Sequence, residues 1–515
     1  MVVAQAIYSP EAGFRTNTDD FRDYVNRKYG LQLNDYEALH KFSVTRLNDF
    51  WMAVWQYCNI RASIQPSRAL DSDAPAMFPP PHFFPEARMN YAENMLRGKD
   101  DAVAVIEINE TNLHKPVRYT WKSLKGLVAR YSGILRHLGV KKEDVIVVIG
   151  GNCVRSLALL LAAASLGALF ASFQTDMGEK ALIGRIDQLQ PKVIIAECVY
   201  RYNGKLNNIT EKVTKAAQVA NSRLLISEAV KDIPQGSQML DDITWNESTE
   251  DLHFEQVPTN QPFIVMFSSG TTGTPKGIVH SQGGLMINGI KEHLIHNNFG
   301  PKDIHFHFSG IGWTLWNISI GAMFTGATMV LYDGSPFHPS SDEFLKAIFA
   351  TGVTAYGGSP RYFSELQKGN VTPRKYATKM HTLLSTGALL TPGTASWLAE
   401  AFGPVCQIGF SGGTELCGNF MTGTRSLPSY PGEIAVLELG MDVAAFGPDG
   451  TPVPDGEAGE LVCRKPFPNM PVKFWNDTEG KRYHKSYFEG FLGAYVTKYK
   501  IFANGVCKMF GRMVI

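Results

Sequence analysis

From residue 102 onward, short apolar runs alternate with longer segments in which apolar residues recur at helical spacing. The runs predict strands at 102–108, 144–150, 192–197 and 223–227, and the segments predict helices at 120–139 and 153–168. Further strands are predicted at 305–309, 328–334, 355–358, 382–387 and 407–410. Strands separated by helices are typical of parallel sheets covered on both faces. We therefore predict an α/β fold with two mostly parallel sheets flanked by helices.

Both ends of the chain depart from this alternation. Residues 35–60 carry large apolar side chains at helical spacing and predict a helical region that docks on the next domain: Leu39, Phe42, Leu47, Phe50, Trp51 and Trp55. The proline cluster at 77–87 then requires an extended connection. Residues 432–463 combine closely spaced glycines and prolines with alternating apolar residues, which predicts a small antiparallel β unit.

Composition narrows the possible classes of protein. A chain of 515 residues with 44% hydrophobic residues can build two or three cores. A net charge of +1 offers no electrostatic case for nucleic acid or an anionic membrane. The seven cysteines are scattered without a CxxC pair, so neither a zinc knuckle nor a disulfide framework is indicated. The apolar run at 157–172 is too short to span a bilayer, and no secretory signal is evident. A reducing, cytoplasmic location is expected.

Residues 267–277 read FSSGTTGTPKG and follow a predicted strand at 263–267. A Walker A loop has its lysine directly after the second glycine, whereas Lys276 follows Pro275, so that class of phosphate loop is excluded. Backbone N–H groups at the glycines, several hydroxyls and Lys276 could still bind phosphate oxygens. The alternative is a plain Ser/Gly-rich surface loop. The candidate phosphate ligands are Ser268, Ser269, Gly270, Thr271, Thr272, Gly273, Thr274 and Lys276.

This loop resembles the signature loop of the AMP-forming acyl-CoA synthetases and their adenylating relatives. Two later motifs extend the resemblance in the order found in that family: STGALL at 385–390 and FSGGTELCG at 410–418. The resemblance implies that Ser385, Thr386, Gly387 and Ala388 border adenine. It further implies that Thr414 touches the α-phosphate and that Glu415 holds Mg²⁺ between ATP phosphates, with Thr414, Glu415 and Lys276 as catalytic residues. Alone, the Thr-Glu pair would also suit a helix start.

The same resemblance implies positions for the acid and for coenzyme A. Trp313 and Thr314 fall where the family places its carboxylate pocket, although either tryptophan of the segment 310–317 could also be a core residue. Arg185 falls where acetyl-CoA synthetases contact the 3′-phosphate of coenzyme A, and its alternative is a surface helix arginine. Acetyl-CoA synthetases close their pocket with a tryptophan just before the Thr-Glu pair. Here Gly412 and Gly413 occupy those positions, so a deeper pocket floor is expected.

Several segments resemble acetoacetate-activating members of the family, including 329–336, 439–450 and 474–488. The resemblance therefore implies ATP-dependent ligation of a short acid, foremost acetoacetate, to coenzyme A through an acyl-adenylate. A β-keto group would need a hydrogen-bond donor in the pocket, for which Asn317 is the candidate. Propionate or another short acid is the alternative substrate.

The resemblance divides the chain into three parts: an N-terminal helical region at 1–94, an adenylation domain at 95–491 and a final segment at 492–515. The final segment contains neither the ribose-binding aspartate nor the catalytic lysine of the family's small C-terminal domain. We therefore expect that domain to be missing, residues 492–515 to be an aberrant tail, and both half-reactions to be impaired. The alternative is a catalytically inactive nucleotide- or acyl-binding fragment.

Overall fold

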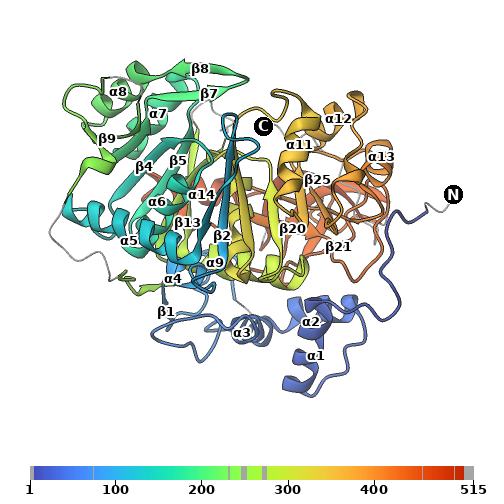
Figure 1. Cartoon of the computed structure of the whole chain (residues 1–515). Helices are drawn as coiled ribbons and strands as arrows, with labels where there is room; N and C mark the ends of the chain where they lie inside the picture. Colours follow the sequence, from blue (N-terminus) through green and yellow to red (C-terminus); the bar gives the residue numbers. More distant parts are fainter. Residues whose placement is uncertain are drawn as a thin grey trace.

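The computed structural model describes residues 5–72, 75–229, 232–244, 252–268, 275–454, 456–491 and 493–503. Two large sheets lie side by side in these residues, with helices packed on their faces (Figure 1). The α-helices are α1 Asn17–Tyr29, α2 Tyr36–Thr45, α3 Leu47–Tyr57, α4 Tyr91–Met95, α5 Trp121–His137, α6 Val154–Ser165, α7 Glu179–Leu189, α8 Thr210–Val219, α9 Gln282–Ile290, α10 Thr314–Ile320, α11 Ser341–Ala350, α12 Pro360–Lys368, α13 Pro392–Phe402 and α14 Lys481–Tyr487.

The first sheet has the strand order β10-β9-β6-β4-β5-β12-β13-β24 in the described chain. Neighbouring strands from β10 to β12 all pair in parallel. At one edge, β13 pairs antiparallel with β12, and β24 pairs antiparallel with β13. The strands are β4 Val145–Gly150, β5 Leu169–Gln174, β6 Val193–Glu197, β9 Arg223–Glu228, β10 Gln238–Met239, β12 Pro262–Ser268, β13 Lys276–Ser281 and β24 Lys473–Phe474.

The second sheet has the order β18-β17-β16-β14-β15-β2-β3, and only β3 runs antiparallel among these described strands. Its strands are β2 Val103–Asn109, β3 Val117–Thr120, β14 Ile304–His307, β15 Thr328–Asp333, β16 Ala355–Gly358, β17 Thr382–Ser385 and β18 Cys406–Gly409. Every residue of α6 apart from Arg155 is buried, as the apolar composition of 153–168 predicts. The predicted fold of two mostly parallel sheets is therefore confirmed.

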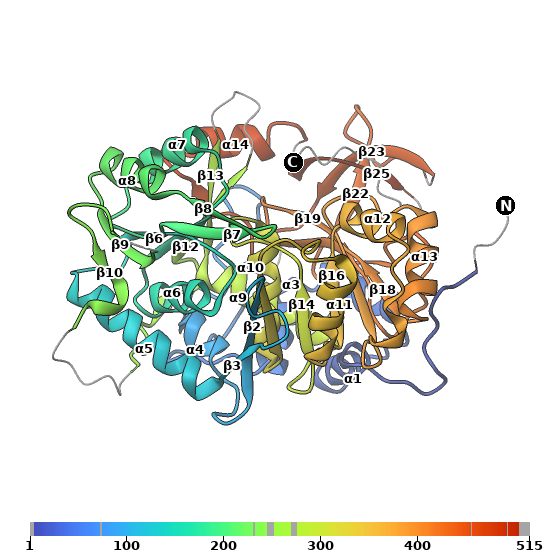
Figure 2. The same ribbon diagram turned by 45° about the horizontal axis from the view of Figure 1, so that its top comes forward.

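The remaining described strands form smaller units: β1 Arg88–Met89 with β11 Val257–Pro258, β7 Val199–Tyr202 with β8 Lys205–Asn208, β19 Ser411–Gly413 with β20 Gly418–Thr422 and β21 Val436–Leu437, and β22 Val443–Phe446 with β23 Glu457–Cys463 and β25 Tyr495–Ala503. The sheet formed by β22, β23 and β25 is antiparallel, as expected for residues 432–463. Its third strand comes from the segment predicted to be an aberrant tail. Figure 2 shows β25 beside β22 and β23 at the top of the molecule.

The N-terminal helices α1, α2 and α3 pack beneath the sheets (Figure 1). Residues 35–60 form two helices rather than one, because the backbone of Arg46 leaves the helical conformation and both ends α2 and begins α3. Trp51 is fully buried, and Lys291 Nζ lies 5.3 Å from its ring centroid. Lys291 also forms a 2.9 Å ion pair with Glu438, and both side chains are completely inaccessible to solvent. The predicted docking face is thus a buried interface.

None of the helices in the described part of the chain is long and apolar enough to cross a membrane.

Candidate active site

A cavity of about 500 Å³ lies where strands of both large sheets reach their carboxyl ends. Asn152 and Gln174 line it from the first sheet, at the ends of β4 and β5. Ser309, Asp333 and Ser359 line it from the second sheet, beyond or at the ends of β14, β15 and β16. The carboxyl ends of parallel strands are the usual ligand-binding edge of an open α/β sheet. This cavity is therefore the candidate active site.

The phosphate-loop sequence connects β12 and β13, which pair antiparallel with Ser268 opposite Lys276. The intervening candidates Ser269, Gly270, Thr271, Thr272, Gly273 and Thr274 lie outside the described residues. Lys276 Nζ donates a 2.7 Å hydrogen bond to Ser486 Oγ in α14 and lies 5.3 Å from the ring centroid of Phe474. The loop lysine is thus held by a segment about 200 residues further along, and neither partner was foreseen from the sequence.

Thr414 is placed at the cavity by two hydrogen bonds. The hydroxyl of Thr314 donates to the hydroxyl of Thr414 at 3.1 Å. The carbonyl oxygen of Thr414 lies 2.8 Å from His280 Nε2. Burial lowers the pKa of His280 to about 4, so its imidazole is neutral at pH 7 and can donate to this carbonyl. His280 is a supporting residue that motif comparison alone did not single out.

The expected adenine-binding turn follows β17. Ser385 is buried at the end of this strand, and Thr386 donates a 2.7 Å hydrogen bond to the carbonyl of Phe410. Gly387 has a φ of 95°, in the region that favours glycine. Thr386, Gly387 and Ala388 line the candidate active-site cavity. The turn therefore lies at the same cavity as Thr414, although the sequence separates them by more than 20 residues.

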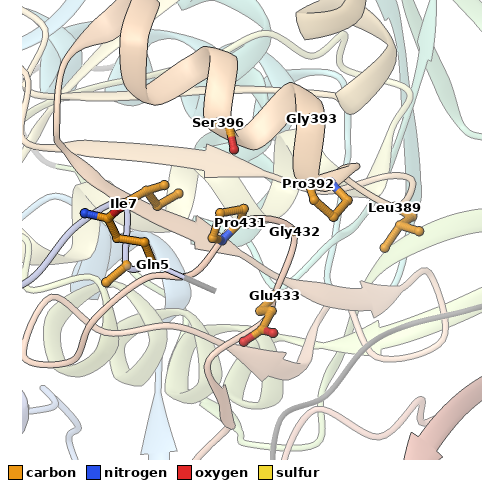
Figure 3. Close-up of a pocket in the computed structure, with 10 residues that line it drawn as sticks. Gln5, Ile7, Leu389, Pro392, Gly393, Ser396, Pro431, Gly432 and Glu433 are labelled. Atoms are coloured by element: carbon orange, nitrogen blue, oxygen red, sulfur yellow. The ribbon is translucent and has the colours of Figure 1, made fainter. Parts of the chain in front are cut away.

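A second hollow of about 660 Å³ lies beside this turn. Figure 3 shows it between Gln5 and Ile7 of the N-terminal segment, Pro392 at the start of α13, and the turn at Pro431. Leu389, Gly432 and Glu433 line both this hollow and a narrow pocket that includes Ser385 and Gly387. The N-terminal segment therefore borders the outer side of the adenine-binding turn.

The residues expected to form the acid pocket divide into two groups. Trp313, Thr314, Gly412 and Gly413 line the cavity, with Trp313 half exposed, while Trp316 is the buried tryptophan of the segment. Asn317 is not among the lining residues. Its amide nitrogen instead lies 3.5 Å from Met266 Sδ. Because α10 turns Asn317 toward the core, the structure does not favour it as the pocket donor.

Arg185 lies in α7, where its guanidinium stacks 5.6 Å from the ring centroid of Phe267 and donates to the carbonyl of Ala181 at 2.7 Å. Partial burial lowers its pKa. It does not line the cavity, but Phe267 directly precedes the candidate phosphate ligand Ser268. Arg185 is therefore beside the start of the phosphate loop, a placement compatible with a phosphate of coenzyme A.

Three carboxylates that the sequence did not indicate hold the turn between β4 and α6. Glu197 accepts from the N–H of Gly151 at 3.1 Å, and Asp333 accepts from the N–H of Asn152 at 3.1 Å. Glu107 accepts from the first residue of α6 at 2.7 Å. Burial, reinforced by nearby acidic groups, raises the pKa of Glu197 to about 8 and that of Asp333 to about 6. Glu197 is therefore mostly protonated at pH 7.

The family model described as AMP-binding enzyme matches residues 92–470, which is more than half of the chain, so this protein belongs to that family. It is 36% identical to acetoacetyl-CoA synthetase from Danio rerio over 96% of this chain and 75% of that protein. It is 32% identical to malonamoyl-CoA synthetase from Penicillium aethiopicum over 92% of this chain and 69% of that protein. The solved structure titled acetoacetyl-CoA synthetase from Streptomyces lividans matches with a TM-score of 0.93 at 32% identity, covering 99% of this chain and 80% of that one.

These matches correct one expectation about the end of the chain. The structural match covers 99% of this chain, so it extends into the segment 492–515 that was expected to depart from the family. Within that segment, β25 pairs with β23, and Tyr495 is fully buried and donates to the carbonyl of Glu415 at 3.3 Å. A missing C-terminal domain, an aberrant tail and the impairment inferred from them are therefore not supported.

Proposed function

We propose that this protein activates acetoacetate with ATP and transfers the acetoacetyl group to coenzyme A, releasing AMP and pyrophosphate. The observation that carries the proposal is the hydrogen bond between Thr314 and Thr414, because it joins the expected acid pocket to the expected α-phosphate residue in one cavity. Family membership supports adenylate chemistry, and the relatives titled acetoacetyl-CoA synthetase support the acid.

In the first half-reaction, a carboxylate oxygen of the acid attacks the α-phosphorus of ATP, and the bond to the pyrophosphate oxygen breaks. Thr386, Gly387 and Ala388 border the adenine, and the Thr414 hydroxyl donates to an α-phosphate oxygen. Lys276 and Ser268 stand at the two ends of the phosphate loop and stabilise the leaving pyrophosphate. Charge that develops on oxygen in the transition state is neutralised by these fixed donors rather than by reorganising water.

Glu415 would hold Mg²⁺, which when bound supplies charge neutralisation between the phosphates. A carboxylate such as that of Glu415 suits Mg²⁺, which usually binds through one or two carboxylates together with substrate phosphates and water. Glu415 follows Thr414 directly, so one short segment reaches both the α-phosphate and the ion.

In the second half-reaction, the sulfur of coenzyme A attacks the carbonyl carbon of the acyl-adenylate. The carbon–oxygen bond to AMP breaks, and the thiol proton passes to solvent. Arg185, beside the start of the phosphate loop, would bind the 3′-phosphate of coenzyme A.

A cytoplasmic location remains a prediction.

The proposal is tested by two assays on the purified protein. Pyrophosphate exchange into ATP reports adenylation, and chromatographic detection of acetoacetyl-CoA reports thioester formation. We expect both signals with acetoacetate, and loss of exchange by about 100-fold in Thr414→Val. No exchange with acetoacetate or with any other short acid would overturn the proposal and favour an inactive nucleotide-binding protein.

Malonamate is a second candidate acid, because a relative at 32% identity is titled malonamoyl-CoA synthetase. Propionate stands for the short acids without a β-carbonyl. A panel of acetoacetate, malonamate, propionate and acetate at fixed ATP, read as kcat/KM in the exchange assay, separates these substrates.

A further inference from the structure

A short hairpin, formed by β7 and β8, leaves the first sheet directly after β6 and extends toward β2 (Figure 1). Its strands pair antiparallel, with Tyr202 opposite Lys205. Asn203 and Gly204 form the two-residue turn, with φ angles of 52° and 75°. A tight hairpin turn of this kind needs positive φ at both central residues, and the sequence Asn-Gly adopts it most readily. The local sequence therefore builds the β7–β8 hairpin and the turn at its outer end.

The carboxylate of Glu110 fixes this turn to the second half of the fold. It accepts from the N–H of Asn203 at 2.7 Å and from the N–H of Gly204 at 2.8 Å. The same carboxylate accepts from the N–H of Ser335 at 2.7 Å. Glu110 follows β2 and Ser335 lies just beyond β15, so one side chain joins the β7–β8 hairpin to two strands of the second sheet. Hydrogen bonds to a carboxylate are stronger than those between neutral groups, so the turn is held firmly.

The β7–β8 hairpin forms part of the wall of the candidate active-site cavity, through Tyr200, Arg201 and Tyr202. Tyr202 is 48% exposed, and Arg201 is exposed as well, so a ligand can reach both side chains. The guanidinium of Arg201 donates to the carbonyl of Gly204 at 3.4 Å, and across the described ranges of the chain it forms no ion pair. Its charge is therefore available to an anionic ligand.

The position of the β7–β8 hairpin separates it from the expected ATP site. In the second sheet, β15 and β2 are three and four strands from β17 and its adenine-binding turn, or roughly 14 and 19 Å at the usual strand spacing. In the first sheet, β6 is three strands from β12, where the phosphate loop begins, again roughly 14 Å. Arg361, the other arginine on the cavity wall, follows β16, which is the neighbour of β17. Arg201 is thus the cationic residue of the wall that lies away from both ends of the expected ATP site.

We propose that the β7–β8 hairpin binds coenzyme A, with Arg201 donating to a phosphate group of the coenzyme and Tyr202 packing against it, and that Glu110 is the positioning residue that holds the hairpin at the cavity. This inference rests on the proposed function and assigns residues to its second co-substrate. The acid must lie beside the α-phosphate, and AMP still occupies its own site when the thiol attacks. Coenzyme A must therefore approach from the part of the cavity that ATP does not fill.

The chemistry of the two side chains suits this ligand. Arginine binds phosphate through charge-assisted and often bidentate hydrogen bonds. Tyrosine offers a rigid, largely apolar ring against which the coenzyme can pack. Because both residues directly precede the turn that Glu110 holds, loosening the turn should displace both of them.

The test separates the two half-reactions, because pyrophosphate exchange into ATP needs no coenzyme A. Arg201→Ala removes the cation, and Glu110→Gln replaces one acceptor oxygen with an NH2 group that cannot accept from the turn. For both variants we expect the KM for coenzyme A in thioester formation to rise about 5- to 20-fold. Exchange with acetoacetate should stay within about twofold of wild type, because the lost contact belongs to the second substrate. Calorimetric titrations should show weaker binding of coenzyme A and unchanged binding of ATP.

Lys205→Ala is the matched control, since Lys205 is an exposed cation of the same hairpin that does not line the cavity. It should leave the KM for coenzyme A within about twofold of wild type. Thermal unfolding checks that each variant is folded, and Tyr202→Ala gives a second test at an exposed position if Glu110→Gln does not fold.

An unchanged KM for coenzyme A in Arg201→Ala, or an equal rise in Lys205→Ala, overturns the inference. A loss of exchange in Glu110→Gln as large as its loss of thioester formation also overturns it, because that result marks a general structural role. Weaker binding of ATP but not of coenzyme A would assign the phosphate to ATP and overturn it as well. A wild-type protein that shows no exchange with any short acid would instead overturn the proposed function, while the titrations with coenzyme A would still decide the role of the hairpin.

Discussion

The hydroxyl of Thr314 donates a 3.1 Å hydrogen bond to the hydroxyl of Thr414, although 100 positions separate the two residues. Thr314 begins α10 in the second half of the fold, and Thr414 follows β19. Each residue resembles a family position with a separate role, one for the acid and one for the α-phosphate. Their contact means that the position of the acid and the position of the phosphate depend on each other.

Removing this contact should therefore weaken the enzyme's use of both the acid and ATP, and the two effects should be coupled. Thr314→Val keeps the shape of the side chain and removes the hydroxyl, so we expect the KM for acetoacetate to rise by about 5- to 10-fold. Combined with Thr414→Val, the effects should be non-additive by about 0.5–3 kcal/mol in kcat/KM, because the residues share one hydrogen bond. Steady-state exchange kinetics on the four proteins measures this coupling, and strictly additive effects would contradict it.

The hydrogen bond from Lys276 to Ser486 predicts a positioning role for α14. Ser486→Ala removes this hydrogen bond, so the lysine side chain is held less firmly before ATP binds, and the KM for ATP should rise by about 3- to 10-fold with little change for the acid. Ser486→Thr keeps a hydroxyl and should restore the wild-type value. The adjacent exposed residue offers a matched control as Lys485→Ala, and an effect there equal to that of Ser486→Ala would argue against the contact.

The protonated state of Glu197 predicts a pH-dependent difference in stability. Burial raises its pKa from 4.5 to about 8, so the folded protein binds a proton that the unfolded chain releases above pH 4.5. The wild-type protein therefore loses stability through this group as pH rises from about 4.5 to about 8. Glu197→Gln does not titrate and keeps the acceptor for the N–H of Gly151. Its free energy of unfolding relative to wild type should increase over that window, by at most about 1.4 kcal/mol per pH unit. Urea unfolding at several pH values measures this difference. A difference in unfolding free energy that does not change with pH would be inconsistent with a buried, protonated Glu197.

The close approach of β19 and β20 predicts that position 412 tolerates no side chain. Gly412→Ala places a methyl group 1.7 Å from the carbonyl oxygen of Gly418, so the hairpin must open. We expect a loss of about 2 kcal/mol or more in unfolding free energy together with loss of adenylation. Gly126→Ala, in α5 with nothing within 4 Å of the new atom, is the matched control and should stabilise the protein by about 0.5–1 kcal/mol. Equal behaviour of the two variants would show that the hairpin is not closely packed.

Local patterns in the sequence were sufficient for the secondary structure and for the class of chemistry. Apolar runs such as 144–150 and 192–197 became β4 and β6, because a parallel strand buried on both faces must be apolar along its whole length. The segments around Lys276, Ser385 and Thr414 indicated the family, because a phosphate-binding turn depends on glycines and hydroxyls that are close together in the chain.

The details of the site depended on contacts between distant segments, which no local pattern contains. The direction of the Asn317 side chain follows from how α10 packs, and this placed it against Met266 instead of in the pocket. The protonation of Glu197 depends on burial among groups from other strands. Within the final segment, Tyr495–Ala503 could be placed as β25 only through its register with β23.

The sequence by itself determined that the chain forms two mostly parallel sheets and carries the motifs of an adenylate-forming enzyme, because helical and strand periodicity and turn chemistry are local properties. Only the tertiary structure decided that β20 occupies the space a side chain at Gly412 would need, and that Thr386 and Thr414 line one cavity. The physical reason is that packing and desolvation are set by atoms that meet in space, and residues of the two sheets line one cavity only after the sheets have come together.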